Sequence, residues 1–286
     1  MPELPEVETI RAGLEPYLLG KTIERIETYH PRVSRHDPQG FVAFSGQTVQ
    51  EVARRGKYLW LRCDAQKVIL AHLRMSGQFR INSEPHPHLR ASFFFTDGMR
   101  LDFLDQRTFG YLHADELVPT ADGSRGWYRS TEPLIPRSAL HIAPDLLDPD
   151  LSLTHLAQRA KMKKTRIKTL LLDQSFVSGI GNIYADEALW EAKLNGVIPA
   201  CRISTARLSL LLQAVQAVMH RSIRAGGTSF DSLYVNVNGS SGYFARELNA
   251  YGRSGLPCKR CGTPLIREAF MGRSSTFCPR CQARRK

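Results

Sequence analysis

The chain has 286 residues, of which 42% are hydrophobic and 23% charged, enough to bury a core in two domains or in one large and one small domain. It lacks the run of about eighteen apolar residues that a transmembrane helix needs, and its start lacks the basic and apolar regions of a signal peptide, so we expect a cytoplasmic protein. The net charge of +12 favours a polyanionic partner, most simply nucleic acid, over a solvated basic face.

Residues 1–8 combine two prolines and three carboxylates directly at the chain start. A helix is predicted to follow, because apolar residues recur at spacings of three and four and Pro5 suits a first helical turn. The apolar stripe comprises Val7, Ile10, Leu14 and Leu18.

This start also suggests chemistry. If Met1 is removed, Pro2 has a secondary amine near the positive end of a helix, which favours the neutral, nucleophilic form. Such an amine forms an iminium ion with an aldehyde-level carbon, and Glu3 and Glu6 are close enough in sequence to move the protons. The alternative is an ordinary helix cap with acidic residues favoured by the helix dipole.

The segment up to residue 131 is predicted to form an antiparallel β-sandwich with the first helix at its edge. Asp97-Gly98 between two β-rich runs is a strong hairpin signal. The runs read as strands are residues 22–30, 48–63, 67–75, 92–96 and 99–104.

Four prolines between residues 132 and 150 indicate a linker. Residues 151–249 are then predicted to form a helical domain, ending in a loop rich in Gly, Ser and Asn from residue 228 onwards. The predicted helices are residues 151–160, 165–172, 183–194 and 204–224.

Four cysteines form two C-x2-C pairs separated by sixteen residues, which is the spacing of a zinc ribbon. Residues 250–286 are therefore predicted to hold one structural Zn²⁺, since four thiolates leave no position for water. Cys63 and Cys201 look like isolated core residues, which fits a reducing compartment. The ligands are Cys258, Cys261, Cys278 and Cys281.

Three features together, PELPEVE at residues 2–8, GNIY at residues 181–184 and the four-cysteine finger, resemble the bacterial formamidopyrimidine-DNA glycosylases. The resemblance extends from Pro2 to Cys281. It implies a multidomain α and β fold: a β-sandwich, a helix–two-turn–helix domain and a zinc-finger hairpin.

The implied activity is base-excision repair. The family removes oxidised purines, namely 8-oxoguanine and formamidopyrimidines, from double-stranded DNA and cuts at abasic sites. The resemblance implies that Pro2 attacks the sugar C1′ to form a Schiff base that undergoes β- and δ-elimination. It assigns Glu3 as acid and proton shuttle and Glu6 as support for ring opening or positioning. We expect a monomer in the bacterial cytoplasm, associated with the nucleoid through DNA.

A base inside a duplex must be flipped out before it can react, and the vacancy must be filled. Residues 72–77 and 105–110 match the family's two void-filling motifs, which implies that Met75 and Phe109 fill the gap and Arg107 faces the estranged cytosine. Without the resemblance, core packing would be the simpler interpretation of both apolar side chains. The family usually has Gly at position 74, and Pro and Arg at positions 106 and 108, where this chain has Arg74, Gln106 and Thr108.

Further positions match family residues that contact DNA. Lys57 matches a strand lysine that contacts phosphate and assists catalysis, and Arg273 matches the finger arginine that holds a phosphate. Asn182 is predicted at the start of a helix, where its side-chain amide and the nearby backbone N–H groups suit a phosphate oxygen. A plain helix cap is the alternative. The remaining matches are His88, Lys168, implicated in damaged-base recognition, and Tyr243 in a lesion-capping loop at residues 228–244.

Two other functions stay open at this point. Endonuclease VIII, the sister enzyme for oxidised pyrimidines, shares Pro2 and Glu3 but usually begins PEGPE. A non-catalytic zinc-finger DNA-binding protein would keep Arg273 and the basic residues but would have no need for a free Pro2.

Overall fold

The structure, a computed structural model, describes residues 2–34, 40–228 and 244–284. The chain divides into two compact units. Unit 1 comprises Met1–His141 and Ala225–Tyr243, and unit 2 comprises Ile142–Arg224 and Phe244–Lys286. Within the described part of the chain, no helix is both long and apolar enough to cross a membrane.

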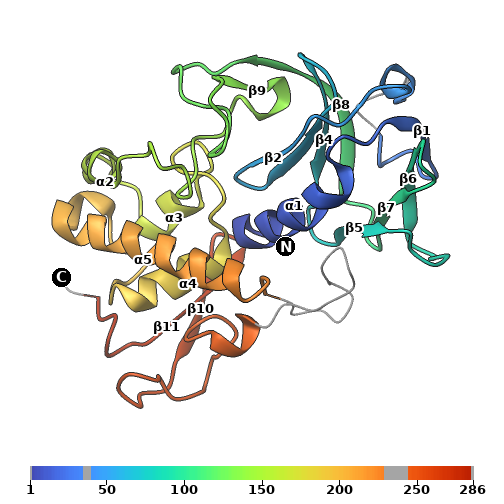
Figure 1. Cartoon of the computed structure of the whole chain (residues 1–286). Helices are drawn as coiled ribbons and strands as arrows, with labels where there is room; N and C mark the ends of the chain where they lie inside the picture. The colour runs from blue at the N-terminus through green and yellow to red at the C-terminus, as the bar shows by residue number, and fades with distance from the viewer. Residues whose placement is uncertain (1, 35–39, 229–243, 285–286) are drawn as a thin grey trace. The chain divides into compact units, whose positions relative to one another are not determined.

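In its described residues, unit 1 contains the α-helix α1 (Leu4–Leu18) and two antiparallel sheets (Figure 1). Helix α1 packs against strands β2 and β3. The four-stranded sheet has the order β1 (Ile23–Thr28), β6 (Leu89–Phe95), β7 (Arg100–Asp105) and β5 (Gly77–Ile81). The five-stranded sheet has the order β2 (Glu51–Arg55), β3 (Tyr58–Arg62), β4 (Lys67–His72), β8 (Tyr111–Pro119) and β9 (Leu134–Pro136).

The core of unit 1 lies between these sheets, which confirms the predicted sandwich. Alternate residues of each strand point to the same face, so Leu59 and Leu61 of β3 share one core with Phe93 and Phe95 of β6. The stripe of α1, including Ile10, joins the same core.

Two details of unit 1 differ from the sequence prediction. The run at residues 48–63 is a hairpin rather than one strand, because Gly56, with φ of 57°, allows a two-residue turn between β2 and β3. The predicted linker at residues 132–150 contains β9, which pairs with β8 through Ile135 and Val118.

Unit 2 is helical, as predicted, with a two-stranded hairpin between the cysteine pairs. Its helices are α2 (Leu153–Lys161), α3 (Ile167–Leu172), α4 (Asn182–Glu191) and α5 (Thr205–Arg224), and its strands are β10 (Ile266–Phe270) and β11 (Arg273–Phe277). Helix α4 is buried along almost its whole length because α3, α5 and β11 all pack against it. Short 3-10 helices in the two units lie at Val42–Phe44, Arg137–Ala139, Ala200–Arg202 and Phe244–Glu247.

Candidate active site and nucleic-acid interface

Pro2 and Glu3 are buried directly before the first turn of α1. Glu3 is the N-cap residue, and its N–H donates to Glu6 Oε2 over 2.9 Å while its carbonyl accepts from the Val7 N–H. The cap and the candidate catalytic residues are therefore one local structure, which holds Pro2 beside the positive end of the helix.

The second oxygen of Glu6 contacts a segment that lies far away in the sequence. Glu6 Oε1 accepts from both the backbone N–H and the hydroxyl of Thr228, over 2.9 and 2.8 Å. Thr228 begins the predicted lesion-capping loop, of which residues 229–243, including Tyr243, lie outside the described residues. Since both carboxylate oxygens accept hydrogen bonds, Glu6 links the start of α1 to the start of this loop.

A buried ionic cluster holds α1 against the sheet. Glu8 Oε2 accepts from Arg54 Nε over 2.8 Å, and Glu8 Oε1 accepts from Arg11 Nε and the Tyr128 hydroxyl. Arg11 also donates to the Val52 carbonyl of β2. Removing one partner from such a cluster leaves an uncompensated buried charge, so the position of α1 is strongly determined.

Lys57 is buried in the two-residue turn between β2 and β3, and not within a strand as its family match implied. The neighbouring strand β4 ends at His72, whose Nδ1 accepts from the Arg74 N–H over 3.0 Å. Burial, with the nearby charges of Arg74 and Lys57, lowers the pKa of His72 to about 3. The imidazole is therefore neutral and serves as an acceptor.

The two candidate void-filling segments are loops at one end of the sandwich strands: residues 73–76, here the Met75 loop, and residues 106–110, here the Phe109 loop. Met75 is 43% exposed and Phe109 50% exposed, so core packing does not account for either side chain. Arg107 is exposed as well. An exposed Met and Phe in neighbouring loops have the chemistry of wedges that enter a base stack.

Each of these loops has a residue with positive φ directly before its apolar side chain. Arg74 has φ of 52° and Thr108 has φ of 53°, a conformation that costs little for glycine but is strained for a β-branched residue. The positive φ at position 74 suits the Gly that the family resemblance implies there. In this chain the Arg74 guanidinium lies 5.6 Å from the centroid of the Tyr111 ring.

His88 lies half-buried in the turn before β6. Its N–H donates to His86 Nδ1 and its carbonyl accepts from the Asp105 N–H over 2.8 Å. The backbone contact places His88 beside the strand end from which the Phe109 loop begins.

In unit 2, two predicted DNA-binding residues donate to the backbone carbonyl of the residue that follows a third, Arg273. Asn182 Nδ2 and Lys168 Nζ both donate to the Ser274 carbonyl, over 2.9 and 3.0 Å. Ser274 follows Arg273, which is exposed at the start of β11. The start of α4 and the exposed arginine therefore lie together, as a phosphate site requires.

Lys168 is completely buried, with 0% exposure. Its ammonium pairs with Asp186 Oδ1 over 2.6 Å, and Asp186 also accepts from the Ser275 hydroxyl and the Thr276 N–H. The pair therefore fixes β11 against α3 and α4, and the ammonium is directed into unit 2.

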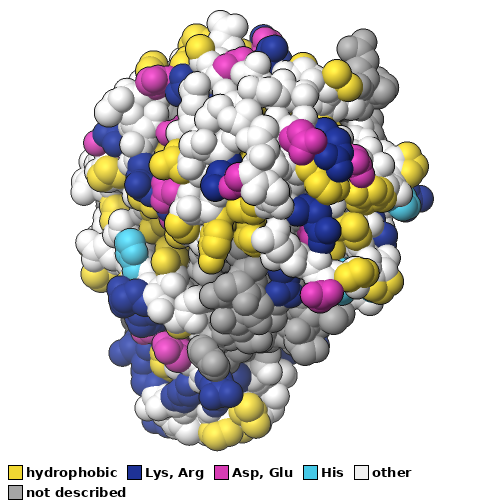
Figure 2. Space-filling model, turned by 45° about the vertical axis from the view of Figure 1, so that its right-hand side comes forward, with side chains coloured by type: hydrophobic (Ala, Val, Ile, Leu, Met, Phe, Trp, Pro, Cys, Tyr) yellow, Lys and Arg dark blue, Asp and Glu magenta, His cyan; other side chains and the backbone are white. Residues whose placement is uncertain are grey.

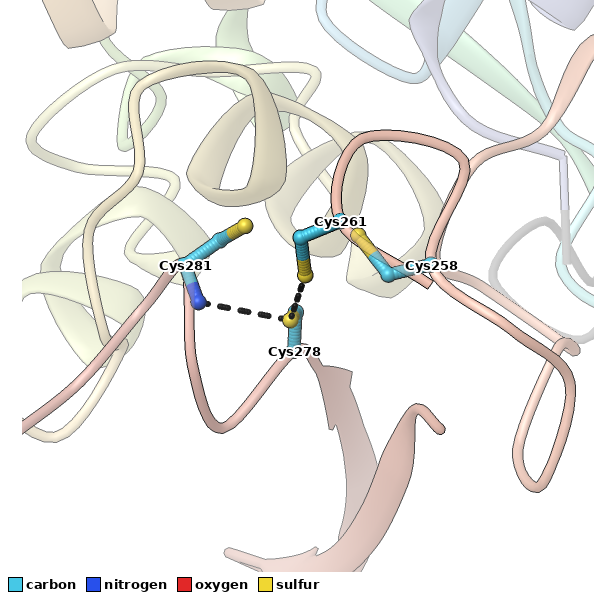
Figure 3. A group of neighbouring side chains, drawn as sticks. All are labelled: Cys258, Cys261, Cys278 and Cys281. Atoms are coloured by element: carbon cyan, nitrogen blue, oxygen red, sulfur yellow. Dashed lines mark hydrogen bonds between the residues drawn. The ribbon is translucent and has the colours of Figure 1, made fainter. Parts of the chain in front are cut away.

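The four cysteines lie in two turns, Cys258 and Cys261 in one and Cys278 and Cys281 in the other (Figure 3). Their sulfur atoms all lie within 4.8 Å of one another. A tetrahedral ion with metal–sulfur bonds of about 2.3 Å requires sulfurs about 3.8 Å apart, so the group fits such an ion. Trp190 Nε1 and the Cys281 N–H donate to the sulfurs of Cys258 and Cys278, as expected around thiolate ligands.

Basic side chains are frequent on unit 2. Figure 2 shows Lys and Arg gathered low in the view, at the height where Figure 1 draws the red C-terminal segment. The exposed ones include Lys163, Lys164, Arg166, Arg273 and Arg280. Such a surface attracts a polyanion.

Proteins of a known family are similar to this chain over its whole length. Residues 1–112 match the formamidopyrimidine-DNA glycosylase N-terminal domain, residues 142–233 its H2TH domain, and residues 255–284 the zinc finger found in FPG and IleRS. The formamidopyrimidine-DNA glycosylase of Acidothermus cellulolyticus is 50% identical over 290 residues, covering 99% of this chain and 97% of that protein. The chain belongs to the formamidopyrimidine-DNA glycosylase family. As a member, it is a base-excision-repair DNA glycosylase.

Further relatives agree with this family assignment. The formamidopyrimidine-DNA glycosylase of Corynebacterium efficiens is 50% identical over 296 residues and covers 99% of both chains. The MutM (Fpg) protein of Thermus thermophilus has a TM-score of 0.84 at 35% identity over 100% of both chains. The Lactococcus lactis Fpg, solved with DNA containing an abasic site, has a TM-score of 0.83 at 29% identity, covering 99% of this chain and 100% of that one.

Sequence reasoning passed over several residues that organise this glycosylase site. Thr228, Arg54 and Tyr128 are separated by 46 to 222 positions from the acidic residues they contact, so no local pattern marks them. Asp105 had a signal, because it opens the motif at residues 105–110.

Proposed function

We propose that this glycosylase removes oxidised purines, namely 8-oxoguanine and formamidopyrimidines, from double-stranded DNA and then cuts the strand at the abasic site. The observation that carries the proposal is Pro2 held directly before the start of α1, with Glu3 as its N-cap and Glu6 bonded to the Glu3 N–H. An amine at this position is close to both carboxylates and to the positive helix end.

In the proposed reaction, the amine of Pro2, freed by removal of Met1, forms a bond to C1′ as the bond between C1′ and the base breaks. The bonding pair leaves with the base, and Glu3 supplies and relays protons. Opening of the sugar ring gives an iminium ion. Loss of a C2′ proton then expels the 3′ phosphate, and a second elimination expels the 5′ phosphate.

Glu6 has a positioning part in this scheme. Both of its oxygens accept hydrogen bonds, one from the Glu3 N–H and two from Thr228. It therefore holds the start of the helix that follows the nucleophile in a fixed position relative to the start of the lesion-capping loop. Loss of its charge would affect both.

DNA is gripped through phosphates in this proposal. Lys57 and His88 of unit 1 and Asn182 and Arg273 of unit 2 supply the contacts. Lys168 acts indirectly, because its buried ammonium holds the Ser274 carbonyl next to Arg273. Met75, Phe109 and Arg107 fill the vacancy and face the estranged cytosine, and Tyr243 belongs to the loop that covers the flipped base.

We infer that the four cysteines bind one Zn²⁺, since tetrahedral thiolate sites favour this ion. When bound, it stiffens the hairpin that carries Arg273. We further infer that the enzyme acts as a monomer on cytoplasmic DNA, where lesion-containing and abasic duplexes are its substrates.

A second substrate class has specific support. A structure of the Lactococcus lactis Fpg was solved with DNA containing an oxidised pyrimidine, so oxidised pyrimidines are a candidate minor substrate. Parallel single-turnover rates on duplexes with 8-oxoguanine opposite C and thymine glycol opposite A rank the two. A faster rate on thymine glycol would indicate endonuclease VIII-like specificity.

Borohydride trapping tests the reaction type, because only a Schiff base becomes covalently fixed to DNA. Pro2→Gly should lose most trapping and strand cleavage while the thermal midpoint is kept, and intact mass should show removal of Met1. Glu3→Gln serves as the matched variant, which should bind lesion DNA yet fail to excise the base.

Trapping by Pro2→Gly at the wild-type level would mean that another amine, such as that of Lys57, is the nucleophile. A wild-type protein that binds lesion DNA but never traps would instead be a non-catalytic zinc-finger binder.

A further inference from the structure

One buried carboxylate connects the two loops that carry Met75 and Phe109. Asp105, the last residue of β7, is 1% exposed. Its Oδ1 accepts from the Ser76 hydroxyl over 2.5 Å and from the Arg107 N–H over 3.1 Å, and its Oδ2 accepts from the Gly110 N–H over 2.6 Å. Ser76 belongs to the Met75 loop, and Arg107 and Gly110 belong to the Phe109 loop.

The link between the loops is closed by a direct bond. The Arg107 N–H also donates to the Ser76 hydroxyl oxygen over 3.2 Å. The Ser76 hydroxyl therefore accepts a hydrogen bond from the Phe109 loop and donates one to the Asp105 carboxylate, which also accepts from the Phe109 loop. A charged acceptor strengthens each of these bonds beyond that of a neutral pair.

Both loops also rest on one aromatic ring. A Cβ added at Gly77, where the Met75 loop meets β5, or at Gly110 would approach Phe103 Cζ to 2.9 Å. Only glycine allows such close approach. Phe103 is fully buried in β7, so the ends of both loops pack against the same immobile ring.

We propose that Asp105 is a positioning residue that makes the Met75 loop and the Phe109 loop a single wedge, so that both side chains enter the base stack together. This inference rests on the proposed function, in which these side chains fill the vacancy left by the flipped base. Asp105 acts on base eviction and not on the reaction at C1′.

Two variants break the link in different ways. Asp105→Asn turns one acceptor oxygen into a donor that faces a backbone N–H. Ser76→Ala removes only the bridge between the loops and leaves the bonds from Arg107 and Gly110 to the carboxylate, so it stays informative if Asp105→Asn folds poorly.

Asp102 offers a matched control on the same strand. It is 0% exposed and accepts from the hydroxyls of Ser83 and Ser92, but it lies away from both loops. Asp102→Asn should therefore lower the thermal midpoint without a preference for one substrate.

The test compares single-turnover excision from an 8-oxoguanine duplex with cleavage at a preformed abasic site. Asp105→Asn and Ser76→Ala should slow excision by about tenfold or more, while abasic-site cleavage stays within about twofold. Equal losses on both substrates, or no loss on either, would overturn the proposal.

An NMR measurement on the DNA-free protein separates this proposal from the proposed function. The methyl signal of Met75, labelled with carbon-13, should shift in Asp105→Asn, Ser76→Ala and Phe109→Ala but not in Asp102→Asn. An active wild-type enzyme with an unresponsive Met75 signal would refute the shared wedge alone. A responsive signal in a wild-type protein inactive on both substrates would refute the proposed function and leave the coupling of the loops standing.

Discussion

Arg74 combines two opposed effects in one residue of this glycosylase. Its φ of 52° costs free energy that glycine would avoid, of the order of 1 kcal/mol. Its guanidinium, exposed beside Met75, adds a positive charge where DNA would approach. Arg74 therefore lowers the free energy of unfolding through its backbone conformation and adds a positive charge to the surface.

Substitution of Arg74 should separate the two effects. Arg74→Gly should raise the free energy of unfolding by about 1 kcal/mol, and it should lower the slope of log affinity against log salt by about one phosphate contact. Arg74→Ala should show the same loss of salt dependence without the gain in stability. Thermal unfolding and DNA titration at several salt concentrations measure both. Unchanged salt dependence in both variants would exclude a phosphate contact.

His72 makes the stability of the folded protein depend on pH. Its pKa is lowered to about 3 in the folded protein, whereas it is about 6.5 in the unfolded chain. Between these values the unfolded state binds more protons, so the free energy of unfolding falls as pH drops below 6.5. The loss from this residue is about 2 kcal/mol at pH 5.

His72→Asn tests this contribution, because an amide oxygen can still accept from the Arg74 N–H but does not titrate. Urea unfolding of the two proteins at pH 7 and pH 5 should show a smaller acid loss in the variant. Parallel losses would mean that other groups dominate the acid sensitivity.

Strand β11 owes its position to an ion pair in the helical unit. Lys168 and Asp186 are both buried and pair over 2.6 Å. Breaking such a pair on one side is costly because the remaining charge stays buried, whereas replacing both partners is often nearly neutral.

Lys168→Met should therefore destabilise the protein by about 3–5 kcal/mol, and the double variant Lys168→Met/Asp186→Asn should recover most of that loss. Urea unfolding followed by the fluorescence of Trp190 in the neighbouring helix measures both. The DNA affinities of the wild type, the double variant and the single variant should rank in the same order as their stabilities, because the ion pair affects DNA binding only through the position of Arg273. A double variant as unstable as the single one would argue against the ion pair as the cause.

The whole molecule contains two compact units, and the four-cysteine group belongs to unit 2. The apolar cluster around the cysteines is small, consisting of Trp190, Ala250 and Leu265 with Cys258 and Cys278, too little to fold the finger alone. The sandwich of unit 1 has a much larger core.

Chelation of the metal should therefore act locally. The β10–β11 hairpin should lose its protection from hydrogen exchange, and affinity for lesion DNA should fall about tenfold or more, while the strands of unit 1 keep their protection. Added zinc should restore both properties. Normal DNA binding by the metal-free protein would show that the hairpin does not require the ion.

The elements with local signals were the predictable ones. The stripe of α1, the Asp97-Gly98 hairpin and the cysteine spacing each mark their structure within a few residues. Strand β8 was missed because its central residues are only half-buried and do not alternate cleanly. Contacts such as Glu6 with Thr228, 222 positions apart, follow from tertiary packing and leave no pattern in the sequence.

The shared support of the two wedge loops has a consequence for evolution. Because one carboxylate and one ring serve both loops, a substitution in either loop changes the conditions under which the other is selected. This chain has Arg74 in the first loop and Gln106 and Thr108 in the second, where the family resemblance implies Gly, Pro and Arg. We expect these positions to covary among relatives, with Asp105 and Phe103 invariant beneath them.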